Sequence, residues 1–322
     1  MIPVRILGTA SVLPERRVTT RELGEALGRN PSAIEHKTGI RARHWSPPGT
    51  SMAELGAQAL RGALAAAGLD ARNLRRILFV SSTGGDVLIP ATANRVAAAL
   101  GLAGTCDAFD LNNACMGFVS AFDVASRSVA TGLGPVAIVV VELGSRIISV
   151  EEPRPYLVFG DAAAAAIVGT ARDGEGVLGA AFGNDGTQPS DVWMAHPLVT
   201  RTAERVRFEF SNQHIAEVAI EALKTATRAV LEQACLSLAE VEWVLPHQPN
   251  GAMLRLITEA LGVDPARIVP VVEEVGSVGA ASIPISLDRL LRTRTVRAGA
   301  RLLMVGVGAG VSHGAVLYRV GG

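Results

Sequence analysis

The feature that most constrains the fold of this 322-residue chain is an internal repeat in its pattern of strands, turns and helices. Two pairs of dipeptides correspond in the same order: Leu100-Gly101 with Leu261-Gly262, and Gly117-Phe118 with Gly279-Ala280. Their offsets are 161 and 162 residues, and an ordered series at a nearly constant offset indicates a repeated architecture. Each copy is predicted as strand, helix, strand, sharp turn, helix, strand. The sequence therefore predicts two duplicated halves, 1–170 and 171–322, that meet around a shared site.

Apolar runs alternate with alanine-rich stretches along the chain, which is typical of layered α/β folds. The run at 77–82 is predicted as a strand, 91–101 as a helix and 137–143 as another strand. Apolar residues make up 49% of the chain and charged residues 19%, which suits central strands covered on both faces. The proline-rich stretches 46–50 and 151–156 are predicted as loops. The expected class is α/β, with buried strands between helical layers.

The charge balance and the few cysteines argue against several classes of protein. The formal net charge is +0, whereas nucleic-acid-binding proteins usually carry a basic surface. The longest apolar runs, 136–141 and 162–168, are shorter than the ~20 residues of a membrane helix. No basic-then-apolar leader opens the chain, and three cysteines are too few and too widely spaced for a disulfide framework or a zinc site. We expect a soluble, cytoplasmic protein without metal, membrane or nucleic-acid partner.

Cys115 is the candidate nucleophile, because it lies between a predicted strand at 108–111 and a helix that begins directly after it. A thiol at the N-terminus of a helix is close to the positive end of the helix dipole, which lowers its pKa and favours the thiolate. The alternative is that Cys115 is simply a small buried residue, as most lone cysteines are.

His247 is the candidate base, in the segment WVLPHQPNGAML between an apolar strand and an amphipathic helix. A histidine at the end of a strand can accept a proton or stabilise an oxyanion; alternatively, it is a loop histidine bonded to its neighbours. The duplicated halves place His247 and Cys115 at strand ends that face each other. A Cys–His pair of this kind fits nucleophilic acyl transfer.

The glycine-rich segment GVGAGVSHG (306–314) follows the predicted strand RLLMV. A dinucleotide-binding loop is a weak interpretation, because no helix and no later acidic residue complete a βαβ unit. A tight turn that presents backbone N–H groups to a developing oxyanion is the better hypothesis. A purely structural turn remains open.

Together these motifs resemble the ketoacyl-acyl-carrier-protein synthase III (KAS III) family over nearly the whole chain. The segments that carry the resemblance are TGIRARH (38–44), NNACMGF (112–118), VFGDAAAAAIV (158–168), LPHQPN (245–250) and GVGAGVSHG (306–314). The resemblance implies a thiolase-like αβαβα fold and a homodimer with active sites close to its interface. It also implies an acyl thioester on Cys115, an oxyanion hole made by the N–H groups of Cys115 and Ala309, and no cofactor.

Three positions depart from the family pattern. Ser277 opens SVGAAS (277–282) where the family has an asparagine that, with the histidine, stabilises the enolate formed from malonyl-ACP. The shorter hydroxyl puts decarboxylation in doubt, because losing one such donor costs ~10²–10³ in rate. Ala33 replaces a tryptophan that stacks on the adenine of coenzyme A, which favours an acyl carrier protein as donor. His313 replaces another tryptophan and is either a harmless change or a second titratable group.

The leading hypothesis is a KAS III-like acyltransferase of secondary metabolism, with Cys115, His247 and Ser277 at the catalytic site. An acyl group would pass from an acyl carrier protein through Cys115 to a hydroxyl, amine or thiol of a small or carrier-bound acceptor. The alternative is a condensing 3-oxoacyl synthase of fatty acid or polyketide biosynthesis. A third hypothesis is a catalytically silent dimer partner, although such partners generally lose the nucleophile and this chain retains Cys115.

Overall fold

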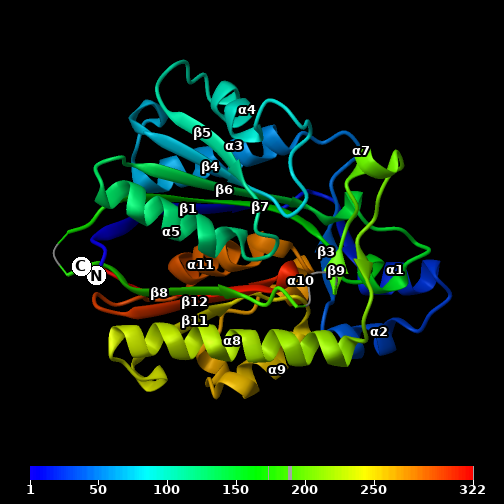
Figure 1. The fold of residues 1–322 in the computed structure, drawn as a ribbon. Coiled ribbons are helices and arrows are strands. Elements are labelled where there is room, and N and C mark those ends of the chain that lie inside the picture. The colour runs from blue at the N-terminus through cyan, green and yellow to red at the C-terminus, as the bar shows by residue number, and fades with distance from the viewer. Residues whose placement is uncertain (173, 188–190, 322) are drawn as a thin grey trace.

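The computed structural model describes residues 1–172, 174–187 and 191–321. Two sheets and three helical layers alternate through the molecule, as Figure 1 shows, in the order helices, sheet, helices, sheet, helices. The expected α/β class with a layered αβαβα arrangement is therefore confirmed. In the described residues no helix is both long and apolar enough to span a bilayer.

The first sheet contains five strands, all from the first 170 residues. In spatial order they are β1 (Val4–Val12), β7 (Asp161–Thr170), β6 (Val136–Leu143), β4 (Arg76–Val80) and β5 (Asp107–Leu111). β4 is parallel to both β5 and β6, whereas β7 is antiparallel to β1 and β6. Helices α3 (Met52–Ala67) and α4 (Thr92–Ala99) cover its outer face. The strands predicted at 77–82 and 137–143 and the helix at 91–101 are confirmed.

The second sheet contains four strands from the later part of the chain. Their order is β11 (Trp243–Pro246), β12 (Arg301–Gly308), β13 (Ser312–Arg319) and β8 (Gly176–Asn184). β11 and β12 are parallel, and β13 is antiparallel to β12 and β8. Helices α8 (Asn212–Ala234) and α9 (Gly251–Leu261) cover the outer face of this sheet (Figure 1).

Helices α5 (Gly117–Ala130) and α11 (Ser282–Thr293) lie between the two sheets. Strand β6 is apolar along nearly its whole length because its alternate side chains face opposite layers, and both layers are buried. Ile138 and Val140 join the core that contains α5 and α11, while Val139 and Val141 join the core under α3. A strand covered on both faces has no solvent-facing side, so its sequence shows no polar alternation.

The two halves are repeated less exactly than the sequence pattern predicts. The third element of the second copy is not a strand: Ile268 makes one isolated bridge to Val244 of β11, and the short α10 (Val272–Val275) follows. The division between residues 170 and 171 falls between β7 and β8 and stays a prediction.

Shorter elements lie together at one end of the two sheets (Figure 1). They are β2 (Arg17–Thr19), α1 (Thr20–Ala26), α2 (Pro31–Thr38), β3 (Ala42–His44), α6 (Pro153–Tyr156), β9 (Val192–Trp193), α7 (Pro197–Thr200) and β10 (Arg207–Phe208). The expectation of a loop at 151–156 is wrong in part, because Pro153, at the first helical position, starts the single turn of α6.

Candidate active site

Cys115 lies in a tight turn between β5 and α5 that is held by local hydrogen bonds. The Asn112 side chain accepts from the Ala114 N–H at 3.0 Å, and the Met116 N–H donates to the Asn113 carbonyl at 2.9 Å. Ala114 has φ of +44°, a left-handed conformation that costs a non-glycine residue about 1–3 kcal/mol. Strain of this kind persists where the surrounding structure enforces it, and here it orients the residue next to the thiol.

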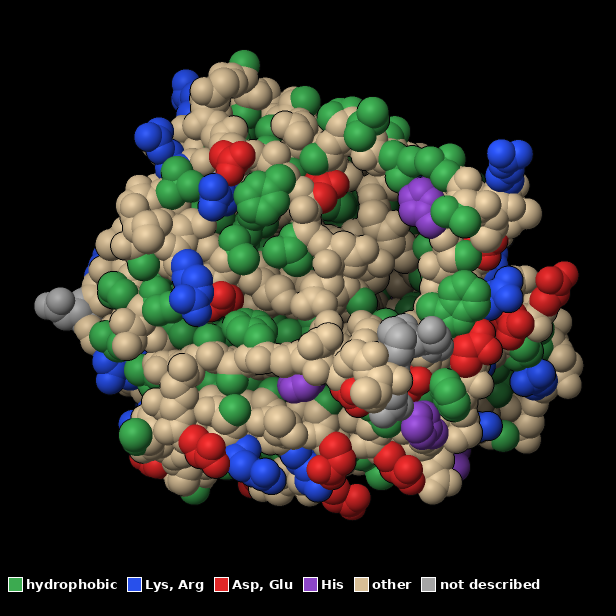
Figure 2. All heavy atoms as spheres, in the orientation of Figure 1, with side chains coloured by type: hydrophobic (Ala, Val, Ile, Leu, Met, Phe, Trp, Pro, Cys, Tyr) green, Lys and Arg blue, Asp and Glu red, His purple; other side chains and the backbone are tan. Residues whose placement is uncertain are grey.

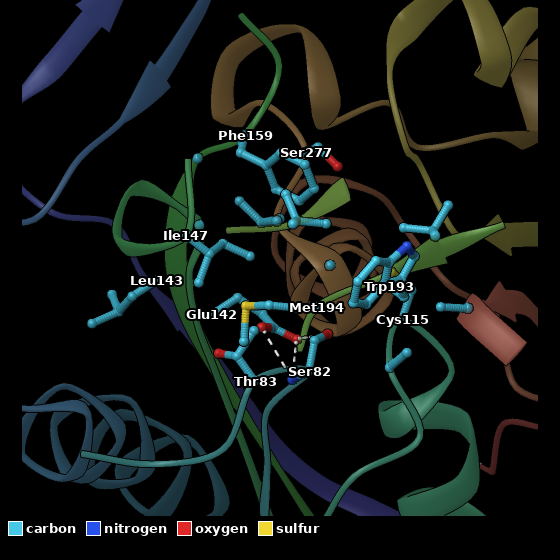
Figure 3. A pocket seen from close by; sticks show the side chains of 18 residues that line it. Ser82, Thr83, Cys115, Glu142, Leu143, Ile147, Phe159, Trp193, Met194 and Ser277 are labelled. Carbon is cyan, nitrogen blue, oxygen red and sulfur yellow. Dashed lines mark hydrogen bonds between the residues drawn. The ribbon is translucent and has the colours of Figure 1, made fainter. Parts of the chain in front are cut away.

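Cys115 opens onto a cavity of about 120 Å³ between the two halves. Ser277 and Ala309 line the same cavity, so the structure brings together three of the residues expected at the site. Much of the wall is apolar: Leu143, Ile147, Phe159, Trp193 and Met194 (Figure 3). The hollow visible in Figure 2 lies beside the segment of β9 and α7, which contributes Trp193 and Met194. The cavity suits an acyl chain.

His247 is buried and is not one of the described residues that line this cavity. Its backbone N–H donates to the Val305 carbonyl at 2.9 Å, which continues the pairing of β11 with β12. Nδ1 lies 2.9 Å from the Ser282 hydroxyl. Burial lowers the pKa of His247 to about 4, and a hydrogen bond with the Gly279 backbone acts against this. Gly279 lines the cavity, so the imidazole contacts a residue of the cavity wall.

Ser277 is fixed by its main chain to the segment that precedes β7. Its N–H donates to the Val158 carbonyl at 2.7 Å, and its carbonyl accepts from the Gly160 N–H at 2.9 Å. The side chain is at the cavity wall and is buried. Its proposed role as the counterpart of the family asparagine stays a prediction.

The glycine-rich turn meets the nucleophile where β12 ends. A Cβ atom placed on Gly308 would lie 3.2 Å from the Cys115 nitrogen and 3.1 Å from the Met116 nitrogen, so a larger residue would push the turn away. Ala309 follows at the cavity wall. The turn leads into the antiparallel strand β13 and not into a helix, which does not match a dinucleotide-binding loop. The oxyanion hole of Cys115 and Ala309 N–H groups stays a prediction that this proximity supports.

His313 lies on β13, paired with Val307, and is not one of the cavity residues. Its ring lies against Gly183, where a Cβ atom would come within 2.7 Å of Nε2. The structure therefore gives His313 a packing role within the second sheet and does not place it beside Cys115.

Three polar residues of the cavity were missed from the sequence: Ser82 and Thr83, which follow β4, and Glu142 on β6. Glu142 Oε1 accepts from the Ser82 hydroxyl at 2.6 Å (Figure 3). It also accepts from the Ala280 N–H at 3.1 Å. Both carboxylate oxygens also accept from the Ser82 N–H, at 3.1 and 3.2 Å. Burial raises the pKa of Glu142 to about 7, against the effect of these hydrogen bonds. An acidic residue near the end of an otherwise apolar strand was the available signal.

The electrostatic surroundings of Cys115 differ from the expectation. Burial raises the pKa of the thiol to about 12, and the charge of Glu142 raises it further. Hydrogen bonding with the backbone of Cys115 and with the Ser82 side chain acts in the opposite direction. The predicted lowering of the thiol pKa is therefore wrong, because enclosure in the cavity outweighs the position before α5. A neutral thiol needs a proton acceptor when it attacks.

Comparisons with known proteins agree with this geometry. Residues 109–186 match the 3-oxoacyl-[acyl-carrier-protein] synthase III family, and residues 231–320 match the C-terminal region of the same synthase. The structure resembles 3-oxoacyl-(acyl carrier protein) synthase III from Pseudomonas aeruginosa PAO1, with 30% identity, a TM-score of 0.91 and 99% of both chains covered. The synthase III of Aquifex aeolicus VF5 is 28% identical, with a TM-score of 0.91 over 98% of this chain and 99% of that one.

A priming β-ketosynthase from the R1128 polyketide biosynthetic pathway is similar to the same degree. It is 28% identical, with a TM-score of 0.91 over 99% of this chain and 96% of the relative. The layered fold and its cysteine turn define an acyl-handling enzyme of the thiolase fold. More narrowly, the chain belongs to the 3-oxoacyl-acyl-carrier-protein synthase III family.

Proposed function

We propose that this enzyme transfers an acyl group from an acyl carrier protein to an oxygen, nitrogen or sulfur nucleophile, without decarboxylating an extender. Cys115 attacks the donor thioester and becomes acylated, and His247 then accepts the proton of the acceptor. Backbone N–H groups of Cys115 and Ala309 stabilise the oxyanion in both steps. The acceptor is a small molecule or a carrier-bound group, and the enzyme acts as a homodimer in secondary metabolism.

The observation that carries this proposal is Ser277 at the cavity wall, the position at which the family pattern has an asparagine that acts with the histidine. Enolate formation requires two donors that converge on one thioester oxygen, and a serine hydroxyl is shorter than an asparagine amide. Deprotonating an external hydroxyl or amine requires only a neutral imidazole and an oxyanion hole. His247 supplies the first, because burial lowers its pKa to about 4.

The buried carboxyl group of Glu142 gives further support. Malonyl extenders carry a carboxylate, and a second negative charge near an ionised Glu142 would be unfavourable in a buried site. A neutral acceptor such as an alcohol meets no such repulsion.

Decarboxylative condensation is the second candidate, and the names of the relatives favour it. The similar proteins of Pseudomonas aeruginosa and the R1128 pathway are described as a 3-oxoacyl synthase and a priming β-ketosynthase. A water held by Ser277 could replace the amide, since water-mediated contacts approach direct ones in strength.

The deciding assay supplies carboxyl-labelled malonyl-ACP to enzyme that has been acylated beforehand. We expect intact-protein mass spectrometry to show one acyl group on the Cys115 peptide, with none in Cys115→Ala. We then expect negligible release of labelled carbon dioxide, and Ser277→Asn should increase that release. Efficient release coupled to a β-ketoacyl product would establish condensation instead. Acylation that persists in Cys115→Ala would remove the acyl-cysteine intermediate altogether.

A further inference from the structure

The mechanism so far leaves the first proton transfer without an acceptor. Burial raises the pKa of the Cys115 thiol, which favours the neutral form, so its proton must move as sulfur attacks the donor thioester. His247 is buried, and its ring is bonded to Ser282 and to the Gly279 backbone. The transfer step already uses His247, whereas two other polar residues, Ser82 and Glu142, line the cavity together with Cys115.

Ser82 and Glu142 are the polar side chains placed to do this. The Ser82 hydroxyl donates its one proton to Glu142 Oε1 at 2.6 Å, which leaves its oxygen lone pairs free to accept from another donor. Ser82 and Cys115 line the same cavity, and the Ser82 side chain lowers the pKa of the thiol. Cys115, Ser82 and Glu142 thus line one cavity, and Ser82 is bonded to the buried carboxylate.

The backbone around Glu142 holds the carboxylate in one orientation. N–H groups of Ser82 and Ala280 donate to it, and these come from separate elements, the end of β4 and the segment before α11. Gly279 leaves room for it, because a Cβ atom there would lie 2.9 Å from Oε1 and 3.2 Å from the Ser82 hydroxyl. This arrangement is preorganised around a carboxylate, and not around a neutral side chain of another shape.

We infer that Ser82 and Glu142 form a proton relay that deprotonates Cys115 during acylation. In this relay Ser82 accepts the proton of the sulfur, and Glu142 acts through Ser82 as the final acceptor. The inference rests on the proposed function, because it assumes that Cys115 is the acylated residue. It divides the work between two groups on opposite sides of Gly279: Glu142 serves acylation and His247 serves transfer.

The relay conserves atoms and charge in both directions. As the Cys115 sulfur bonds to the carbonyl carbon of the donor, its proton passes to the Ser82 oxygen while the Ser82 proton passes to Glu142. The tetrahedral intermediate then breaks its bond to the carrier sulfur. That leaving thiolate takes the proton back from Glu142 through Ser82, which leaves an acyl-cysteine, a free carrier thiol and an ionised Glu142.

If Glu142 acted only through its charge, removing the carboxylate would change the acylation rate in the opposite direction from that expected for a relay. The carboxylate charge raises the pKa of Cys115, so a spectator carboxylate suppresses the thiolate and its removal should speed acylation. A relay carboxylate accepts the proton, so its removal should slow acylation. Glu142→Gln therefore separates the two roles by the sign of its effect.

The experiment measures single-turnover acylation of the full-length enzyme by intact-protein mass spectrometry. The donors are acetyl, butyryl and octanoyl thioesters on a carrier protein. Glu142→Gln should acylate roughly 100-fold more slowly at pH 7.5, within the range of general-base effects. Ser82→Ala should be slowed comparably. Glu175→Gln, which removes a buried carboxylate bonded to Tyr318 far from the cavity, is the matched control and should acylate at the wild-type rate.

The pH profile distinguishes a relay from a structural role. The wild-type rate should rise with pH through about 7 as Glu142 ionises, and Glu142→Gln should lose that inflection. The titratable groups near Glu142 are Cys115 and, across Gly279, His247; burial holds the pKa of His247 at about 4, so it stays neutral throughout this range.

The results separate failure of the relay from failure of the proposed function. Acylation of Glu142→Gln at or above the wild-type rate, with the inflection near pH 7 retained, overturns the relay and leaves the acyl-cysteine intact. If Glu142→Gln does not fold, Ser82→Ala decides, and wild-type acylation in that variant also overturns the relay. A wild-type enzyme that none of these donors acylates contradicts the proposed function itself.

Discussion

His247 shows how burial determines what a single residue can do. Its folded-state pKa of about 4 lies below the ordinary value of 6.5, so the imidazole is neutral, and able to accept a proton, at every pH above about 5. His247→Ala should therefore still acylate itself but lose about 10²–10³ of the rate of transfer to an acceptor. Above about pH 5, protonation of His247 should not change the rate of transfer from pre-acylated enzyme. Below pH 5 the rate should fall, because the ring becomes protonated.

The measurement is the decay of acyl-enzyme mass after an acceptor is added. A transfer rate in His247→Ala equal to that of the wild type would contradict the role. Loss of self-acylation in the same variant would show that the imidazole, and not the Ser82–Glu142 relay, activates the thiol.

At this scale the sequence predicted some site residues and could not predict others. Cys115, Ser277 and Ala309 were recognisable because each lies in a short motif at a turn, and the structure places all three at one cavity. Glu142 was not recognisable, because its partner Ala280 is 138 residues away in the chain. The pKa of Cys115 was also misjudged, because enclosure by a distant segment is invisible in local sequence.

At the scale of elements, the strand–turn–helix unit that carries Cys115 stores strain at Ala114. The left-handed conformation costs alanine about 1–2 kcal/mol, and glycine avoids this cost. Glycine loses more chain entropy on folding, which offsets part of that gain. Ala114→Gly should therefore increase the free energy of unfolding by roughly 0.5–1 kcal/mol in urea titrations. It should also slow Cys115 acylation, because the turn becomes free to leave the productive orientation.

The control is Ala65→Gly, at an exposed position inside α3, which should destabilise by about 0.5–1 kcal/mol without changing acylation. If Ala114→Gly destabilises as much as Ala65→Gly does, the left-handed turn contributes no strain.

Helix α2 bears on the choice of acyl donor. Ala33 is exposed on it and offers no aromatic face. Trp45 does not compensate: its ring is buried 5.4 Å from that of Tyr156, and its N–H donates to the Phe159 carbonyl at 3.0 Å. The enzyme should therefore show a higher kcat/KM with a carrier-protein thioester than with the matching coenzyme A ester.

Ala33→Trp tests the same point by restoring a stacking surface, and it should improve the use of coenzyme A while leaving the carrier-protein reaction unchanged. Wild-type kcat/KM values that are equal on the two donors would contradict this preference.

The long elements of the repeat were predictable because burial on both faces leaves a continuous apolar run, as in β6, and a helical period remains in α5. The short strands β9 and β10 were not, since each is two residues long and, among the described strands, pairs only with the other. The third strand expected in the second half became one bridge at Ile268. Such details depend on tertiary packing and leave no periodic signal.

At the scale of the whole molecule, the two sheets enclose α5 and α11 between them, and the cavity forms where both halves contribute. Cys115 and Glu142 come from the first sheet's layer, while Ser277 and Ala309 come from the later half of the chain. Neither half alone therefore contains the complete site. Two further features, both in the first half, lie at the surface: the edge strand β5 and a neighbouring apolar loop.

These features predict a homodimer. Strand β5 pairs only with β4 among the described strands, which leaves one edge open, and open edges are usually covered or paired. The loop after Ser82 exposes Val87 by 41%, Leu88 by 65% and Ile89 by 87%, an apolar patch that favours a partner surface.

Light scattering should therefore give a mass twice the 33.5 kDa of one chain, and Ile89→Asp should shift the protein toward monomer, because burying an unpaired carboxylate in an interface is costly. Acylation should weaken in parallel, since this loop continues directly from Ser82 and Thr83 at the cavity wall. Val199→Asp, at an equally apolar position that is 81% exposed on α7, is the matched control and should remain a dimer with unchanged acylation. A monomeric wild type at micromolar concentration, or an Ile89→Asp variant that stays dimeric, would show that this loop and edge do not form the interface.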